Sequence, residues 1–104
     1  GIDALFIGPA DLSGSMGHVG QLTHPAVMAV IADAVKRCNA LGMPVGTVGG
    51  TPELVREYRA MGFDFVAIAS DLGLLMRAAT GAVQALRDAP SAPAAPAAAS
   101  SSGY

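Results

Sequence analysis

The sequence predicts an α/β fold built on parallel strands, and two observations carry that prediction. Three short apolar segments alternate with longer segments of helical periodicity, which is the order typical of βα units. A polar residue follows each apolar segment within a few positions, namely Asp11, Thr51 and Asp71. Because the loops of a (β/α)₈ barrel share one face, polar groups at successive strand ends favour three βα units of such a barrel over part of an open doubly wound sheet.

The first unit opens with a strand over residues 4–7. Four consecutive apolar residues suit a strand that is covered on both faces. Gly8 and Pro9 then end the strand, because proline lacks an amide donor and glycine permits a tight turn. We expect a long loop over residues 8–23, with Asp11 in it just beyond the strand end.

A helix over residues 25–41 follows the loop. Pro25 suits the first helical position, His24 precedes it at the cap position, and Gly42 suits the end of a helix. The spacing of apolar residues predicts one buried face. That face holds Val27, Val30, Ile31, Ala34, Val35, Cys38 and Leu41.

The second unit pairs a strand over residues 44–48 with a helix over residues 52–61. Thr51 is expected to cap this helix, with Pro52 at its first position, and Gly62 to end it. Its inner face is predicted to hold Leu54, Val55, Tyr58 and Met61.

The third unit has a strand over residues 65–69 and a helix that runs from the Ser70-Asp71 cap to about residue 87. Its apolar side contains Leu75, Ala79, Ala82, Val83 and Leu86. Gly81 lies within this helix and costs about 1 kcal/mol relative to alanine, so we expect close packing there. Residues 1–88 are thus predicted to form a partial barrel domain, and the Ala/Pro/Ser-rich residues 89–104 a flexible tail.

Composition narrows the function. A chain of 104 residues that is 52% hydrophobic and 13% charged has difficulty covering its own apolar surface, which indicates part of a larger protein or a subunit covered by partners. A net charge of −2 argues against nucleic acid as a partner. With no apolar run long enough to cross a bilayer and no visible signal peptide, we expect no membrane association and a cytoplasmic location. The single cysteine, Cys38, is interpreted as a core residue.

Asp11 is the strongest candidate for chemistry. A carboxylate at a strand end can ligate a divalent ion such as Mg²⁺, Mn²⁺ or Co²⁺, and the Ala10 and Asp11 amides could cradle an anion. Capping of the local turn is the commoner role for an aspartate in this pattern, so from the residues alone both roles stay open. Gly8 suits either a turn or the close approach of a ligand.

The other polar candidates favour structural roles. His24 is expected to cap or pack at a helix start, whereas His18 lies in a glycine-rich stretch and is freer to contact substrate. Capping also accounts for Thr51 and for the Ser70-Asp71 pair, although Gly49 and Gly50 could present amides to an anion.

In order and spacing, residues 2–87 resemble the HpcH/HpaI family of class II pyruvate aldolases, which act on 4-hydroxy-2-oxo acids. The resemblance is carried by Phe6-Ile7-Gly8-Pro9-Ala10-Asp11-Leu12-Ser13, Met16-Gly17, Gly20, His24-Pro25, Gly46, Phe65-Val66-Ala67 and Asp71. It implies the last three βα units, the sixth to the eighth, of a (β/α)₈ barrel. It also implies a homo-oligomer, hexameric in the family, in which the last helix packs on a neighbouring subunit.

The resemblance further implies a site. Asp11 would be one of two carboxylate ligands of a divalent metal, which chelates the 2-oxo acid and acts as a Lewis acid. The Ala10 and Asp11 amides would hold the pyruvate carboxylate, with Gly8 beside them, and Val48 would border the aldehyde end. The family's second ligand, a glutamate, and its catalytic histidine and arginine have no counterpart in this chain, so we expect the isolated chain to be inactive. A non-catalytic interaction module and a citrate-lyase β-like lyase are the alternatives; the latter is disfavoured because no basic cluster for a CoA thioester is visible.

Overall fold

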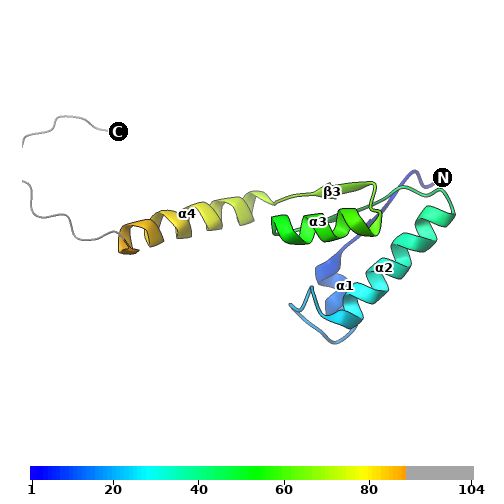
Figure 1. The fold of residues 1–104 in the computed structure, drawn as a ribbon, viewed down its shortest axis with the longest axis horizontal. Helices are drawn as coiled ribbons and strands as arrows, with labels where there is room; N and C mark the ends of the chain where they lie inside the picture. The colour runs from blue at the N-terminus through cyan, green and yellow to red at the C-terminus, as the bar shows by residue number, and fades with distance from the viewer. Residues whose placement is uncertain (89–104) are drawn as a thin grey trace, which may run out of the picture.

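The computed structural model describes residues 1–88, so the tail predicted for residues 89–104 lies outside the described part. Strands and helices alternate along the chain, with one additional short helix after the first strand (Figure 1). Their order is β1 (Leu5–Ile7), α1 (Pro9–Ser15), α2 (Pro25–Ala40), β2 (Val45–Val48), α3 (Pro52–Met61), β3 (Phe65–Ala67) and α4 (Asp71–Asp88).

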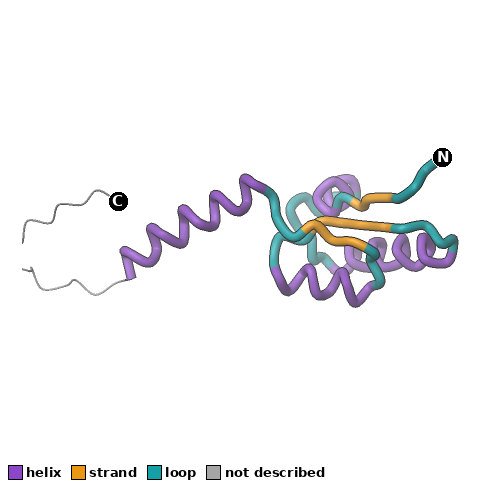
Figure 2. Tube along the Cα trace, turned by 90° about the horizontal axis from the view of Figure 1, so that it is seen from above, coloured by secondary structure: helices purple, strands orange, loops and turns teal. Residues whose placement is uncertain are grey.

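The three strands form one parallel sheet in the order β1-β2-β3 (Figure 2). Ile7 is paired with Thr47, and Val48 with Ala67, so the carboxyl ends of all three strands lie at the same edge. The predicted parallel topology is therefore confirmed. β3 ends two residues before the expected boundary, where the Gly49 amide donates to the Ala67 carbonyl at 2.9 Å and completes the ladder.

The hydrophobic core lies between the sheet and helices α2 and α3. Its buried members come mainly from the predicted inner faces, and Cys38 packs against it. They are Val27, Ile31, Val35, Val45, Leu54, Tyr58 and Phe63. Two residues assigned to the α2 face are exposed instead, Val30 at 42% and Leu41 at 83%. Leu41 is the C-cap residue of α2, where the helical spacing no longer determines which way a side chain points.

The opposite face of the sheet has no covering layer within residues 1–88. Phe6 and Phe65 lie on it with ring centroids 6.2 Å apart, and each ring is about half exposed. Gly46 is required there, because a Cβ at this position would come within 2.0 Å of the Phe65 ring. In a closed barrel this face is the interior.

The sequence predicted a continuous loop over residues 8–23. That prediction is wrong, because the segment begins with helix α1. Pro9 occupies the first helical position and Gly8 is the N-cap. Asp11 therefore lies in the first turn of a helix, three residues after that cap. Proline ends a strand and also begins a helix well, and only the first property entered the prediction.

Helix α4 extends away from the rest of the described chain (Figure 1). It has no buried residue, and the apolar side chains Leu75 and Leu86 are 67% and 81% exposed. The expected close packing at Gly81 is not found: a Cβ there would meet nothing within 4 Å in the described residues.

Candidate functional site

The carboxyl end of the sheet brings the predicted site residues to one edge. Gly8 directly follows β1, and Val48 ends β2, which is paired with β1 up to Ile7 and Thr47. Ala10 and Asp11 occupy the first turn of α1, immediately beyond the same strand end. Strand register and a short helix thus place these four residues on the edge where α/β proteins hold their ligands.

Asp11 carries an exposed carboxylate that does not cap its helix. No side-chain hydrogen bond caps α1, so the capping role left open by the sequence is not the one that the described residues adopt. The side chain folds back over Gly8, where a Cβ would lie 3.3 Å from Asp11 Oδ2. The Ala10 and Asp11 amides belong to the first helical turn and have no intrahelical acceptor. A carboxylate and two backbone donors are therefore available next to each other.

Two buried hydroxyl groups bind the backbone around this segment. Ser13 Oγ donates to the Ala10 carbonyl at 2.8 Å, and Thr47 Oγ1 donates to the Ile7 carbonyl at 2.9 Å. Both side chains are fully buried. Sequence reasoning assigned neither a role. The Ser13 bond follows from the position of serine in a helix, whereas the Thr47 bond depends on strand register.

The cap role predicted for His24 at the start of α2 is confirmed. Its Nδ1 accepts the Ala26 amide at 3.1 Å and caps α2. His18 stacks on His24 with ring centroids 3.7 Å apart. His18, whose role the sequence left open, therefore lies against a helix cap in this structure.

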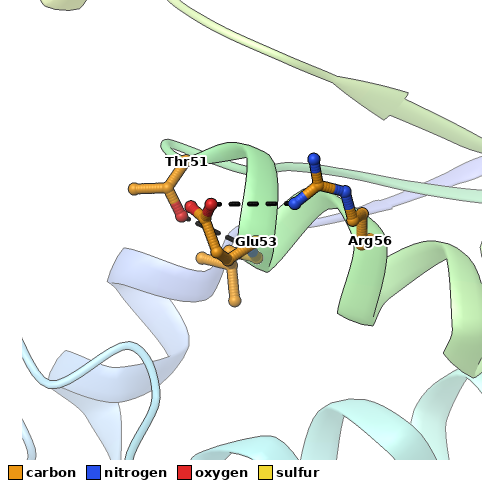
Figure 3. Close-up of polar contacts among 4 residues, drawn as sticks. Thr51, Glu53 and Arg56 are labelled. Carbon is orange, nitrogen blue, oxygen red and sulfur yellow. Dashed lines mark hydrogen bonds and ion pairs between the residues drawn. The ribbon is translucent and has the colours of Figure 1, made fainter.

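Capping is also confirmed for the polar residues after β2 and β3. Thr51 Oγ1 accepts the Leu54 amide at 3.3 Å, and Ser70 Oγ accepts the Gly73 amide at 3.0 Å. Figure 3 shows the Thr51 cap beside the exposed Glu53–Arg56 ion pair, whose charged atoms are 3.6 Å apart.

A cavity of about 580 Å³ lies between the start of α3 and the start of α4. Arg77 lines it, and its Nη1 donates to the Gly50 carbonyl at 2.7 Å. Most of the cavity wall is apolar, from side chains such as Val55, Ile68 and Leu74. Asp11 does not line it.

The donor atoms at Asp11 fit one part of a divalent-metal site. An exposed carboxylate is a ligand that Mg²⁺ and Mn²⁺ accept. Residues 1–88 contain no group of three histidine, cysteine, aspartate or glutamate side chains that could hold a metal together. Among the described residues, Asp11 thus fits the role of one ligand of such an ion. Among the same residues, no helix has the length and apolar content needed to cross a membrane.

Solved structures with this arrangement define the class of protein. An HpcH/HpaI aldolase/citrate lyase family protein from Burkholderia cenocepacia matches 85% of the chain with a TM-score of 0.77 at 36% identity. An HpcH/HpaI aldolase from Desulfitobacterium hafniense matches 86% with a TM-score of 0.77, and at 22% identity shows the fold alone. The chain covers about a third of each, 34% and 35%. Its fold is that of three βα units of a (β/α)₈ barrel.

Sequence comparison identifies the family. The model of the HpcH/HpaI aldolase/citrate lyase family matches residues 1–78, and the chain belongs to this family. It is 52% identical over 87 residues to a 2-dehydro-3,6-dideoxy-6-sulfogluconate aldolase of Pseudomonas putida. The matched region covers 84% of the chain and 34% of that protein. It is 46% identical over 78 residues to a hydroxypyruvate/pyruvate aldolase of Pseudomonas aeruginosa, covering 75% of the chain and 29% of that protein. The chain thus spans about a third of the length of these relatives.

Proposed function

We propose that this chain is the C-terminal part of a metal-dependent aldolase that cleaves 4-hydroxy-2-oxo acids to pyruvate, or a related 2-oxo acid, and an aldehyde. The observation that carries the proposal is the Asp11 carboxylate, which lies just beyond the carboxyl end of β1 and does not cap helix α1. It is supported by membership of the HpcH/HpaI aldolase/citrate lyase family and by the similarity of this chain to proteins named as aldolases. A cytoplasmic location accompanies the proposal as a prediction.

Each site residue has a role that its position favours. Asp11 supplies one carboxylate ligand to a divalent ion, and the Ala10 and Asp11 amides bind the carboxylate of the 2-oxo acid. Gly8 leaves room for that ligand, because a side chain there would press on Asp11 Oδ2. Val48, 37% exposed at the end of β2, provides an apolar border for the aldehyde end. When bound, Mg²⁺, Mn²⁺ or Co²⁺ supplies Lewis acidity toward the substrate oxygens.

The remaining groups of the proposed reaction lie outside this chain. A second carboxylate ligand, a proton-transferring histidine and a substrate-binding arginine are expected from other parts of the barrel. Residues 1–104 alone are therefore expected to give no retro-aldol turnover with metal and substrate. Turnover by the isolated chain would contradict this division of the site.

One observation supports a second role, that of an interaction module. Helix α4 exposes Leu72, Leu75, Met76 and Leu86, each more than half accessible. Such a surface favours contact with another subunit, and we propose that the protein forms a homo-oligomer, as its family resemblance implies. A citrate-lyase β-like activity is less favoured, since the described residues present no basic cluster for a CoA thioester.

The substitution Asp11→Ala tests the proposed metal ligand in the full-length protein. We expect a loss of Mn²⁺ affinity of about 10-fold or more, because even removing a residue that only hydrogen-bonds to a metal ligand costs about 10- to 100-fold, together with loss of aldolase activity. Isothermal titration with Mn²⁺ measures the first, and a coupled pyruvate assay the second.

Asp3→Ala is the matched control, because Asp3 is an exposed aspartate ahead of β1 with no assigned role. It should bind Mn²⁺ as the parent protein does. If Asp11→Ala retains parental affinity and activity, the ligand assignment is wrong.

A further inference from the structure

Apart from the hydroxyl of Tyr58, two polar side chains are buried within residues 1–88, Ser13 and Thr47, and both are fully inaccessible. Burying a hydroxyl carries a cost unless it is hydrogen-bonded. Each of these hydroxyls meets that cost by donating to a backbone carbonyl, that of Ala10 or of Ile7. The two bonds therefore hold the chain at both ends of the segment that contains the proposed site.

The Ser13 bond acts on the peptide unit that carries the Asp11 amide. Its acceptor, the Ala10 carbonyl, belongs to the same peptide plane as the Asp11 N–H. A hydrogen bond to the carbonyl fixes that plane and polarises it, which strengthens the N–H as a donor. The bond thus acts on the peptide unit from which the Asp11 amide projects.

The Thr47 bond acts in the same way on the peptide unit that carries the Gly8 amide. It joins residues 40 positions apart in the sequence at 2.9 Å and ties the end of β1 to β2. A valine would be as well suited as threonine to a buried strand position. Strand pairing and burial at position 47 therefore do not require the hydroxyl of Thr47.

We propose that Ser13 and Thr47 are positioning residues for the 2-oxo acid and metal site, an inference that rests on the proposed function. Neither is assigned contact with metal or substrate. Together their hydroxyls fix the two peptide planes before Gly8 and before Asp11, so the amides and the carboxylate keep one geometry.

The test compares Ser13→Ala and Thr47→Val with parent in the full-length protein. We expect each to weaken pyruvate binding to the Mn²⁺-loaded protein by about 3- to 10-fold, the range for loss of one neutral hydrogen bond. Isothermal titration measures the binding, and KM for the hydroxy-oxo acid should rise more than kcat falls. Thr47→Ser retains the hydroxyl and should restore binding.

Ser15→Ala is the matched control. Ser15 lies in the same helix and donates to the Leu12 carbonyl at 2.9 Å in the same way, but it is exposed and does not hold the segment over residues 8–11. This variant should bind pyruvate as the parent does. A shared loss in Ser13→Ala and Ser15→Ala would overturn the inference.

The outcomes separate the two proposals. If Asp11→Ala retains parental metal and pyruvate binding, the proposed function fails. If Asp11→Ala loses binding while Ser13→Ala and Thr47→Val bind as the parent does, only the positioning role fails. Thermal unfolding identifies any variant that does not fold. If one of Ser13→Ala and Thr47→Val does not fold, the pyruvate binding of the other tests the positioning role. If both fail to fold while Ser15→Ala folds, the hydroxyls serve stability, and the positioning role is overturned.

Discussion

At the scale of single residues, Tyr58 combines full burial with an unmet hydrogen bond. Its hydroxyl has no partner within residues 1–88, although the ring packs edge-on against Phe63 with centroids 5.5 Å apart. Burial, and secondarily the nearby Glu57 carboxylate, raises the pKa of Tyr58 above its ordinary value. The ring stabilises the core while the hydroxyl opposes its own burial.

Tyr58→Phe should therefore preserve stability at neutral pH or increase it by about 1 kcal/mol, because it removes an unpaired buried polar atom. With a raised folded-state pKa, the Tyr58 contribution is complete below about pH 10 and is lost as the pH rises further, since the unfolded chain then releases its proton first. The stability advantage of Tyr58→Phe should grow above that pH.

Denaturant unfolding at pH 7 and pH 11 measures this difference. Tyr58→Phe leaves Tyr104 as the other tyrosine of this chain, so subtracting the two alkaline absorbance titrations reports Tyr58. A variant destabilised by more than 1 kcal/mol at pH 7 would indicate that the hydroxyl has a partner in the full protein.

At the scale of elements, the four described helices begin in two different ways. Helices α2, α3 and α4 each start with a side chain that accepts a backbone amide, from His24, Thr51 and Ser70. Helix α1 starts at Gly8 with no such bond. The helix that carries Asp11 is thus the one of the four whose first-turn amides have no side-chain acceptor, which leaves them available for the carboxylate binding proposed above.

Thr51→Ala should destabilise the protein by about 1 kcal/mol, because it removes the acceptor of the Leu54 amide at the start of α3. Chemical denaturation measures the loss. Thr23→Ala is a suitable control, since Thr23 is an exposed turn residue without a capping bond. Equal losses in both variants would show that the Thr51 cap contributes nothing specific.

The sequence predicted the elements that are long enough to repeat a helical apolar pattern several times. Helix α2 has sixteen residues and a clear apolar face, so its bounds followed from Pro25 and Gly42. Helix α1 has seven residues, among them Gly14 and two serines, too few for a periodic pattern. The position of Asp11 at a strand end was predictable from Gly8-Pro9. The Thr47 bond was not, because it needs the register of two strands forty residues apart.

At the scale of the whole molecule, much apolar surface is left uncovered within residues 1–88. The sheet has helices on one face, while Phe6, Val48 and Phe65 on its strands remain partly exposed. Helix α4 contributes a second uncovered surface (Figure 1). Both agree with a chain that spans a third of its relatives' length, since the rest of a barrel would cover the sheet. Helix α4 extends away from the sheet (Figure 1), and the homo-oligomer proposed above would give its apolar side chains a partner.

We expect this partner to be a second subunit. Fully burying a leucine side chain contributes about 1.5 to 3 kcal/mol, so the double substitution Leu75→Ser and Leu86→Ser should weaken the assembly of the full-length protein. Sedimentation velocity should show a shift to smaller species. Because both leucines are exposed and contact no described core residue, the subunit fold should persist, as circular dichroism can verify.

Leu41→Ser provides the matched control for this assembly. Leu41 is 83% exposed, as much as Leu86 at 81%, but it ends α2 instead of lying on α4. It should leave the sedimentation profile unchanged. If the double α4 variant also sediments as the parent does, α4 is not the subunit contact. If Leu41→Ser dissociates the assembly equally, general loss of apolar surface is responsible, and the specific role of α4 is contradicted.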